Sequence, residues 1–443
     1  MVPERKCKQN TKNVTFLSLY AFLCLFAPPV LPDVNLVLVI ALLSVPYLLI
    51  NAPKAKGILG SYASRSFCAW FGAFATYWVV IMLVNALLSD EVYISDYVTS
   101  AYSFFLVMPT CLVCATTALV YAGKHDLTSS QVIKAFIYAG LVQAAIALAA
   151  FFNQGIKDML TEIMFQNTGT TQMQEGSWIA ERRFYGFANS MLDLYGFGTG
   201  VIASLPAFLV LIDREASKMW LFAVPFLLVV PALNARTGLV LFAIAIVIAS
   251  LYAGKSSGLS IVATMLTALI IALVAAVIIG VIATVRPEII DWLLGDILGT
   301  TQHNTLSILF GEGFWNLPDP LMAITGTGHT VYGVSGFSHS DVGYVNELWR
   351  TGVIGLVLLC GAFARPAMIV LKGANVSGAM RYLIVATVLC LAVAAVKCMP
   401  ITHSGGMILL LSLVLHCGVA TELPKGGEDS NEQRTCKRSR SRL

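Results

Sequence analysis

Long apolar runs with few charges dominate the chain and set its class. About twelve of these runs approach 20 residues, the length that a helix needs to cross a bilayer. None of them alternates between apolar and polar positions as the strands of a transmembrane barrel do. Because a helix satisfies its own backbone groups in lipid, the pattern predicts an all-α integral membrane protein of about 12 transmembrane helices. The expected spans lie near residues 15–32, 34–51, 66–89, 100–122, 132–153, 189–212, 219–235, 237–254, 259–285, 346–371, 379–397 and 401–419.

Two long polar connections interrupt the otherwise tight spacing of these runs. The second, of roughly 60 residues between spans 9 and 10, is expected to be a large external catalytic loop, because long loops are usually functional. The expected organisation is spans 1–5 at 1–153, an external loop at 154–188, spans 6–9 at 189–285, the large external loop at 286–345, spans 10–12 at 346–419 and a cytoplasmic basic tail at 420–443.

The composition agrees with a membrane protein. Apolar residues make up 57% of the chain and charged residues 12%, about half the charged share of a soluble domain. This excludes a soluble enzyme, a disordered protein and a nucleic-acid binder with a basic face. The first apolar run follows basic residues, but it ends in Pro28-Pro29 without a small-residue cleavage site. We therefore expect a retained span and not a signal peptide.

Lysine and arginine are distributed unevenly between the two faces. With the N-terminus in the cytoplasm and alternating spans, 21 of the 28 fall on the cytoplasmic side, which predicts that both termini are cytoplasmic. The basic tail is the candidate contact with anionic membrane lipids, although a disordered tail is the simpler interpretation. The seven external exceptions are Lys157, Arg182, Arg183, Arg236, Arg286, Arg350 and Lys397.

Three of these external arginines are candidates for anion binding. Arg182 and Arg183 stand just before a span, and Gly186 predicts a turn that enters the helix. Arg236 lies in a turn with almost no loop, near the start of a helix whose partial positive charge also attracts anions. A guanidinium matches phosphate oxygens well. The alternative interpretation is an arginine that marks the membrane boundary or reaches to lipid phosphates.

The end of the large loop gathers further polar residues. His339 lies just outside a helix that is expected to start near Asp341, with Tyr344 on the same face. From Asp341 to Leu371 such a helix measures about 46 Å, which exceeds the hydrocarbon thickness of roughly 30 Å. It should therefore begin above the membrane, unless it breaks near Gly352. His339 and Asp341 are the candidate catalytic residues.

The candidate substrate-binding residues are Tyr344, Glu347 and Arg350, because they accompany His339.

Two other motifs receive structural interpretations. The glycine-rich stretch at 325–329 lacks the lysine and the strand-to-helix context of a phosphate-binding loop. Cys111 and Cys114 form a C-x-x-C inside an apolar span, where packing is favoured over redox or metal chemistry.

Taken together, three segments resemble the superfamily of O-antigen polymerases and O-antigen ligases, which are integral membrane glycosyltransferases of bacterial surface polysaccharide assembly. The expected twelve-span topology agrees, so the resemblance covers most of the chain. The matching features are Arg183-x-x-Gly186 with a displaced Asn189, the Arg236-Thr237-Gly238 turn, and the large loop that ends in His339-Ser340-Asp341 and continues to Gly352-Val353-Ile354-Gly355.

The resemblance implies a donor glycan linked to undecaprenyl diphosphate and an acceptor sugar hydroxyl, on the periplasmic face of the inner membrane. It implies that Arg183 and Arg236, with Arg182 beside them, hold the diphosphate and that His339 is the base. It needs no nucleotide sugar, metal or other cofactor. Family members often carry another arginine early in the large loop. Here that region reads Gln302-His303-Asn304, so Arg286 is the candidate for the third anion contact.

Several functions stay open at this stage. The form Ser340-Asp341-Val342-Gly343-Tyr344 looks more like a polymerase, which joins lipid-linked repeat units and has a chain-length regulator as a candidate partner. The alternative is a ligase that transfers the glycan to lipid A-core or to a protein. A flippase or transporter predicts ionisable residues in mid-span, and few are visible. A structural scaffold leaves the external arginines unexplained.

Overall fold

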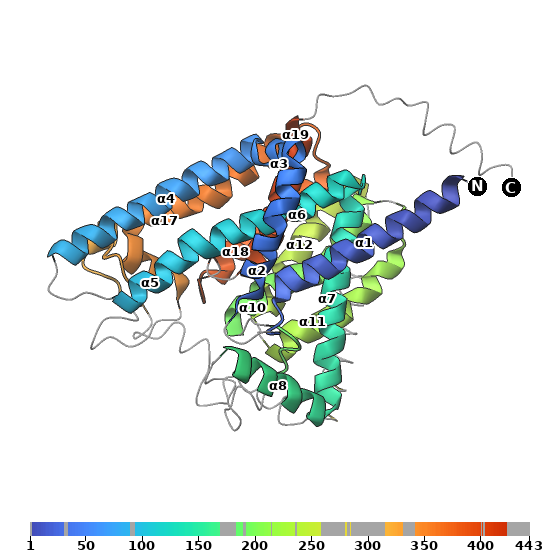
Figure 1. Ribbon diagram of the computed structural model, residues 1–443, viewed down its shortest axis with the longest axis horizontal. Coiled ribbons are helices and arrows are strands. Elements are labelled where there is room, and N and C mark those ends of the chain that lie inside the picture. The colour runs from blue at the N-terminus through green and yellow to red at the C-terminus, as the bar shows by residue number, and fades with distance from the viewer. Residues whose placement is uncertain are drawn as a thin grey trace.

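The computed structural model describes residues 2–30, 34–88, 94–168, 183–188, 192–213, 215–234, 237–257, 280, 284, 315–330, 342–399, 401 and 404–422. Within these residues the secondary structure is helical and contains no strand (Figure 1). The α-helices are α1 (Val2–Phe26), α2 (Leu36–Ile50), α3 (Ala52–Leu59), α4 (Tyr62–Leu88), α5 (Ile94–Tyr102), α6 (Met108–Lys124), α7 (Ser129–Phe152), α8 (Gln154–Thr168), α10 (Leu192–Ile212), α11 (Ala223–Asn234), α12 (Thr237–Ser257), α16 (Pro320–Thr325), α17 (Gly343–Lys372), α18 (Gly378–Ala394) and α19 (Ser404–Glu422). A π-helical turn η1 (Ser103–Val107) joins α5 to α6, and a 3₁₀ turn η3 (Lys218–Phe222) precedes α11.

Many of the described helices have the length and apolarity of membrane spans. Seven helices are long and apolar enough to cross a membrane on their own. The pair of α2 and α3, which is bent by 108°, adds an eighth if it counts as one span. Three shorter apolar helices lie at Thr11–Phe26, Lys218–Asn234 and Gly378–Ala394. The prediction of an all-α membrane protein is confirmed at this level.

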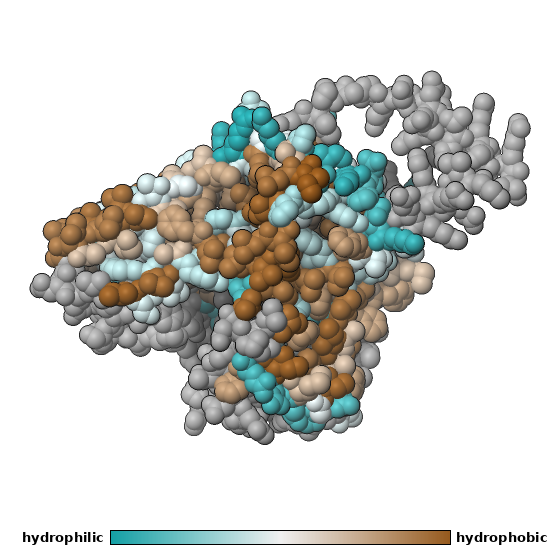
Figure 2. Space-filling model, in the orientation of Figure 1, coloured by the Kyte–Doolittle hydropathy of each residue, from teal (hydrophilic) through white to brown (hydrophobic). Residues whose placement is uncertain are grey.

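Apolar side chains cover the outside of the bundle as well as its interior. Leu42 and Leu43 on α2, and Leu87 and Leu88 on α4, are all more than half exposed. Figure 2 shows apolar residues spread over much of the face in view. A soluble monomer rarely exposes a large contiguous apolar surface, so this outer face suits contact with lipid.

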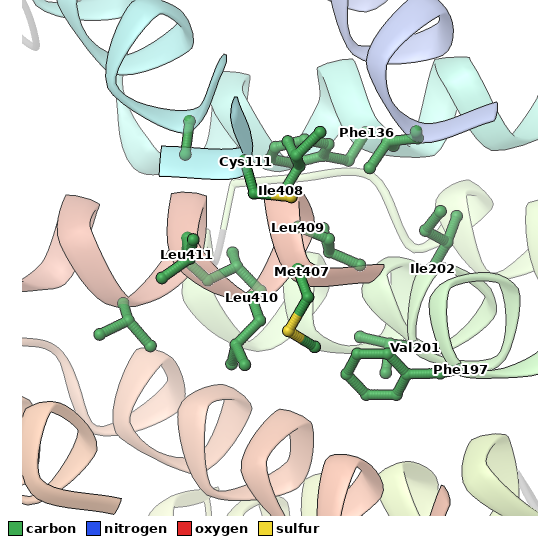
Figure 3. Packing of buried hydrophobic residues seen from close by; sticks show 14 of the residues in the cluster. Cys111, Phe136, Phe197, Val201, Ile202, Met407, Ile408, Leu409, Leu410 and Leu411 are labelled. Atoms are coloured by element: carbon green, nitrogen blue, oxygen red, sulfur yellow. The ribbon is translucent and has the colours of Figure 1, made fainter. Parts of the chain in front are cut away.

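The core lies where α6, α7, α10 and α19 meet. Figure 3 shows the Met407 side chain of α19 extending toward Phe197 of α10, with Cys111 of α6 and Phe136 of α7 in the same cluster. All four side chains are buried in one apolar cluster. Their burial anchors the bundle from which the irregular segments extend.

The C-x-x-C cysteines belong to this core. Cys111 and Cys114 are both completely buried. The Cys111 thiol donates to the carbonyl of Ser404 at 3.5 Å, and the Cys114 thiol donates to the carbonyl of Val37 at 3.9 Å. These contacts link neighbouring helices and agree with the packing interpretation.

Helix α17 breaks at Gly352, the position where the sequence allowed a break. Gly352 has φ +63° and ψ −172°, inside an otherwise helical stretch. A Cβ atom at this residue would lie 2.3 Å from the carbonyl oxygen of Ile324, so only glycine fits. Beyond the break, α17 runs side by side with α4 (Figure 1), and the two form the most extensively packed helix pair of the described chain. The break therefore divides α17 into a first arm, residues 343–351, and a second part that packs against α4.

We predict that Gly352→Ala destabilises the protein. The backbone of Gly352 lies in a region of φ and ψ that is essentially restricted to glycine, so alanine there costs about 1–3 kcal/mol. The contact of the added Cβ atom with Ile324 adds further strain. The melting temperature of the purified protein in nanodiscs should fall by several degrees. Gly72→Ala is the matched control, because Gly72 is helical in α4 and a Cβ there meets no atom within 4 Å. Equal melting temperatures for the two variants would contradict the prediction.

Candidate functional site

The site residues expected from the sequence divide into those that the structure describes and those that it does not. Arg182, Arg236, Arg286, His339 and Asp341 lie outside the described residues. The described ones are Arg183, Tyr344, Glu347 and Arg350. They fall into two groups, one beside α8 and one on the first arm of α17. Figure 1 shows α8 and the α4–α17 pair on separate parts of the molecule.

The first group is built on a non-helical segment, residues 183–188, that enters the bundle. Its backbone is satisfied by Asn234, the last residue of α11. Asn234 Oδ1 accepts from the Phe184 N–H at 2.8 Å, and Asn234 Nδ2 donates to the Phe184 carbonyl at 2.7 Å. Both bonds are buried. The amide side chain therefore fixes this segment to the end of α11.

A second buried amide, on α7, holds the same segment. Gln143 Nε2 on α7 donates to the Tyr185 carbonyl at 2.5 Å and to the Tyr195 hydroxyl at 2.6 Å. Gly186 has φ +66°, and a Cβ there would lie 2.7 Å from Gln143 Nε2. The turn expected at Gly186 thus exists, and it needs glycine both for its backbone and for the approach of Gln143.

Arg183 lies at the start of this segment and contacts the last residue of α11. Its Nη1 donates to the carbonyl oxygen of Asn234 at 2.7 Å and to the Tyr185 hydroxyl at 3.4 Å. Asn234 precedes Arg236 by two residues in the sequence. A cation at the carbonyl end of a helix is favoured by the helix dipole. The structure therefore joins two segments that are about fifty residues apart in the chain.

A small cavity adjoins Arg183. Its lining includes a second cationic residue, Lys157, to which the sequence analysis gave no role. Thr161, Arg183 and Phe184 also line it. The Lys157 side chain on α8 is only 5% exposed, and its Nζ lies 4.4 Å from the centre of the Phe184 ring. The sequence analysis expected Lys157 on the external side, where few cations were expected, and this was the available signal.

The second group centres on a buried ion pair. Glu347 and Arg350, one helical turn apart on α17, form a salt bridge with almost no exposed side-chain surface. Arg350 Nη1 also donates to Ser100 Oγ at 3.2 Å, and its guanidinium lies 4.6 Å from the centre of the Phe104 ring. The pair therefore ties the first arm of α17 to α5 and η1. A role of these two residues in substrate binding stays a prediction.

The glycine-rich stretch packs against this arm. The N–H groups of Thr327 and Gly328 donate to the carbonyls of Trp349 and Arg350 at 2.6 and 2.9 Å. The indole N–H of Trp78 on α4 donates to the Gly328 carbonyl at 2.9 Å. Both Gly326 and Gly328 have positive φ. These two glycines permit close packing of the stretch on α17 and α4. This packing explains the glycine-rich composition without a phosphate ligand.

An acidic side chain fixes the end of this stretch. The Asp96 carboxylate on α5 accepts from the backbone N–H and the hydroxyl of Thr330. His329 beside it is buried, and its Nδ1 lies 3.0 Å from the Thr330 carbonyl oxygen. Asp96 therefore anchors the chain eleven residues before Asp341. Asp96 itself lies in the short connection between the expected spans 66–89 and 100–122 and belongs to no recognisable motif.

Tyr344 lies beside an apolar cavity between α17 and α18. Its hydroxyl donates to the Ala392 carbonyl at 2.7 Å. The cavity has a volume of about 180 Å³ and is lined by Tyr344, Glu347, Leu359, Phe363 and Leu391, among others. The lining is suited to apolar groups, with the Glu347 side chain as its charged member.

Comparison of the chain with models of protein families gives no match, and comparison with curated proteins gives no significant match either. No group of three or more histidine, cysteine or acidic side chains that could hold a metal ion occurs among the described residues. The functional argument therefore depends on the placement of cations and polar groups in this chain.

We predict that Asn234→Ala loosens the segment at 183–188. The change removes the partners of two buried backbone groups at Phe184, each worth about 1–3 kcal/mol. The free energy of unfolding should fall by roughly 2–4 kcal/mol, and limited proteolysis should cut near Arg183 more rapidly. Asn85→Ala is the control, since the Asn85 amide donates to the Ile81 carbonyl within its own helix. Unchanged proteolysis in Asn234→Ala would sink the idea.

We also predict that Glu347→Gln is strongly destabilising, because it leaves the buried Arg350 guanidinium without its counter-charge. Removing one partner of a buried pair costs about 3–5 kcal/mol. The double variant Glu347→Leu/Arg350→Met should recover most of the loss, since apolar replacement of a whole pair is often neutral. Chemical unfolding of the three proteins measures this. A double variant less stable than Glu347→Gln would show that the charges are not coupled.

Proposed function

We propose that the chain is a membrane glycosyltransferase of the O-antigen polymerase type. It transfers an undecaprenyl-diphosphate-linked glycan to a sugar hydroxyl of another lipid-linked repeat unit, on the external face of the bacterial inner membrane. The observation that carries the proposal is the hydrogen bond from Arg183 to the carbonyl of Asn234, two residues before Arg236. It joins the two segments whose arginines resemble the diphosphate-binding arginines of that family.

The chemistry of the reaction suits this arrangement. Cleavage of the bond between sugar and diphosphate develops negative charge on the leaving phosphate. Preorganised cations in a site that partly excludes water stabilise that charge. Arg183 is preorganised, because its guanidinium is held by Asn234 and Tyr185 while it lines a cavity.

The acceptor side of the reaction needs a base. In the proposal His339 takes the proton of the acceptor hydroxyl, with Asp341 beside it, and such a base contributes about 10²–10⁴-fold to the rate. The hydroxyl attacks from the face opposite the diphosphate, so the anomeric carbon inverts. Asp96 supports this assignment indirectly, because it anchors Thr330 near the chain that leads to His339.

We propose a topology of twelve spans with both termini in the cytoplasm. Eleven of the expected ranges overlap described apolar helices, counting the three shorter ones, and the range 259–285 lies outside the described residues except for positions 280 and 284. Contacts between helix ends are consistent with the proposed faces. Lys54 Nζ donates to the Gly123 carbonyl at 2.8 Å, and Ser129 Oγ lies 2.7 Å from His416 Nε2, all at ends assigned to the cytoplasm.

Reconstitution with an undecaprenyl-diphosphate oligosaccharide tests the function. A ladder of longer glycans without any second acceptor is the expected result. Transfer only after addition of lipid A-core would assign a ligase instead. Movement of solute across the membrane with no new glycosidic bond would overturn both enzyme assignments.

We predict that Arg236→Ala and His339→Ala each abolish ladder formation while membrane insertion stays normal. The first removes a cation from the leaving group and the second removes the base. Lys255→Ala is the control, because Lys255 is exposed at the end of α12 that is assigned to the cytoplasm. Gel analysis of the glycan products, with protein levels measured in the same membranes, gives the readout. A normal ladder in either variant refutes the role of that residue.

A further inference from the structure

Helix α3 leaves the direction of α2 at the point where the exposed apolar face of α2 ends. This face continues to the last turn of α2, since Leu49 and Ile50 are 70% and 80% exposed. Directly afterwards the chain bends by 108° into α3, and α4 then forms a candidate span of its own. An exposed apolar face suits contact with hydrocarbon, so its end marks the membrane boundary. Helix α3 therefore lies at this boundary, between two spans.

The side chains of α3 divide into a buried apolar set and an exposed basic set. Ala55 and Ile58 are buried in the main apolar core, and α3 packs against α6 and α19 (Figure 1). Lys54 and Lys56 are exposed. Lysine at a membrane boundary extends its ammonium group toward the lipid headgroups. The exposed part of α3 therefore presents positive charge at the level of those headgroups.

The end of α6 brings a further cation to α3. Lys54 Nζ donates to the carbonyl oxygen of Gly123 at 2.8 Å, next to Lys124. Lys124 is exposed, and its Nζ lies 5.6 Å from the centre of the Tyr47 ring on α2. Asp126 is exposed two residues farther along the chain. This corner is thus basic on balance, with the ammonium groups of two neighbouring helices beside it.

Arg65 marks the opposite end of α3. It is exposed, and its Nη2 lies 3.7 Å from the place that a Cβ atom of Gly60, the C-cap of α3, would take. The sequence has no aspartate or glutamate between residues 34 and 89, so α2, α3 and α4 contribute positive side chains alone. A cation at the end of α6 is favoured by the helix dipole, which explains Lys54. Capping does not require the charges of Lys56 and Arg65.

We propose that α3 is a binding surface for anionic phospholipids, whose headgroup phosphates contact Lys54, Lys56 and Arg65. Anionic lipid attracts basic residues near the membrane surface, and the guanidinium fork of Arg65 matches phosphate oxygens. The proposed topology places this surface in the cytoplasmic leaflet. The binding itself does not depend on the proposed enzymatic function. A soluble phosphate has the same chemistry, and the experiment separates it from the lipid.

Native mass spectrometry of the full-length protein, stripped of lipid in detergent, tests the proposal. The probes are dioleoyl phosphatidylglycerol, which is anionic, and dioleoyl phosphatidylcholine, which is zwitterionic, in separate titrations. The variant Lys54→Gln/Lys56→Gln/Arg65→Gln should bind phosphatidylglycerol about tenfold more weakly, because it removes three charges from the surface. The variant Lys54→Arg/Lys56→Arg keeps these charges and should stay within about threefold of wild type.

A second triple variant is the matched control. Lys218, Lys255 and Lys372 are exposed and lie at helix ends that are also assigned to the cytoplasm, but they belong to other elements. The variant Lys218→Gln/Lys255→Gln/Lys372→Gln removes the same number of charges without touching α3. Its affinity for phosphatidylglycerol should stay within about twofold of wild type.

The possible results separate the lipid surface from simpler explanations. Equal weakening in the two triple variants would assign the affinity to the overall charge of this face and overturn the proposal. Unchanged affinity of the α3 variant for phosphatidylglycerol overturns it too, and so does an equal loss for phosphatidylcholine, which would report damage to the fold. Displacement of phosphatidylglycerol by an excess of inorganic phosphate would reassign the surface to a soluble anion.

A smaller variant keeps the test decisive if the triple α3 variant does not fold. Lys56→Gln/Arg65→Gln leaves the bond between Lys54 and the Gly123 carbonyl intact. It should bind phosphatidylglycerol about fivefold more weakly than wild type and phosphatidylcholine equally well. Wild-type affinity for phosphatidylglycerol in this double variant would refute the assignment.

Discussion

An irregular chain segment inside a membrane protein needs partners for its peptide groups, because lipid offers none. Two irregular segments of this chain depend on that constraint. The segment at 183–188 is satisfied by the amides of Asn234 and Gln143, and the stretch at 325–330 by Trp78 and Asp96 as well as by α17. A few buried polar side chains therefore decide where the segments lie, and the apolar core serves as the frame that holds these side chains in place.

The two segments differ in charge. Around Arg183 a small cavity is lined by two cationic residues, Lys157 and Arg183. Around Arg350 the positive charge is balanced by Glu347, and the guanidinium is enclosed by Ser100 and Phe104. Arg183 and Arg350 both stand out in the sequence as external arginines. Arg183 is held by the Asn234 carbonyl and the Tyr185 hydroxyl beside this cavity, whereas Arg350 links helices through its ion pair.

Much of the helical framework follows from the sequence alone, because apolar length predicts spans directly. Gly186 and Gly352 were also predictable, since a turn or a break needs glycine. Gln143, Asn234 and Asp96 were not, because each is a single polar residue whose partners lie far away in the chain. Their hydrogen bonds are tertiary contacts, and the hydrophobic periodicity of the sequence does not predict such contacts. Glu347 and Arg350 did carry a local signal, since a spacing of three places them on one helical face, and that spacing favours an ion pair.

The sequence separation of the anchoring contacts has a consequence for biogenesis. A chain is made from its N-terminus, and its parts fold as they become complete. Arg183 reaches its acceptor on Asn234 across 51 residues, whereas Thr330 reaches Asp96 across 234. The segment at 183–188 therefore acquires its contact with Asn234 when α11 has been inserted. The stretch at 325–330 acquires its contacts with α17 much later, after that helix has been made. During synthesis the contact between Arg183 and Asn234 therefore forms before the contact between Thr330 and Asp96. The two halves of the candidate site thus mature in a fixed order.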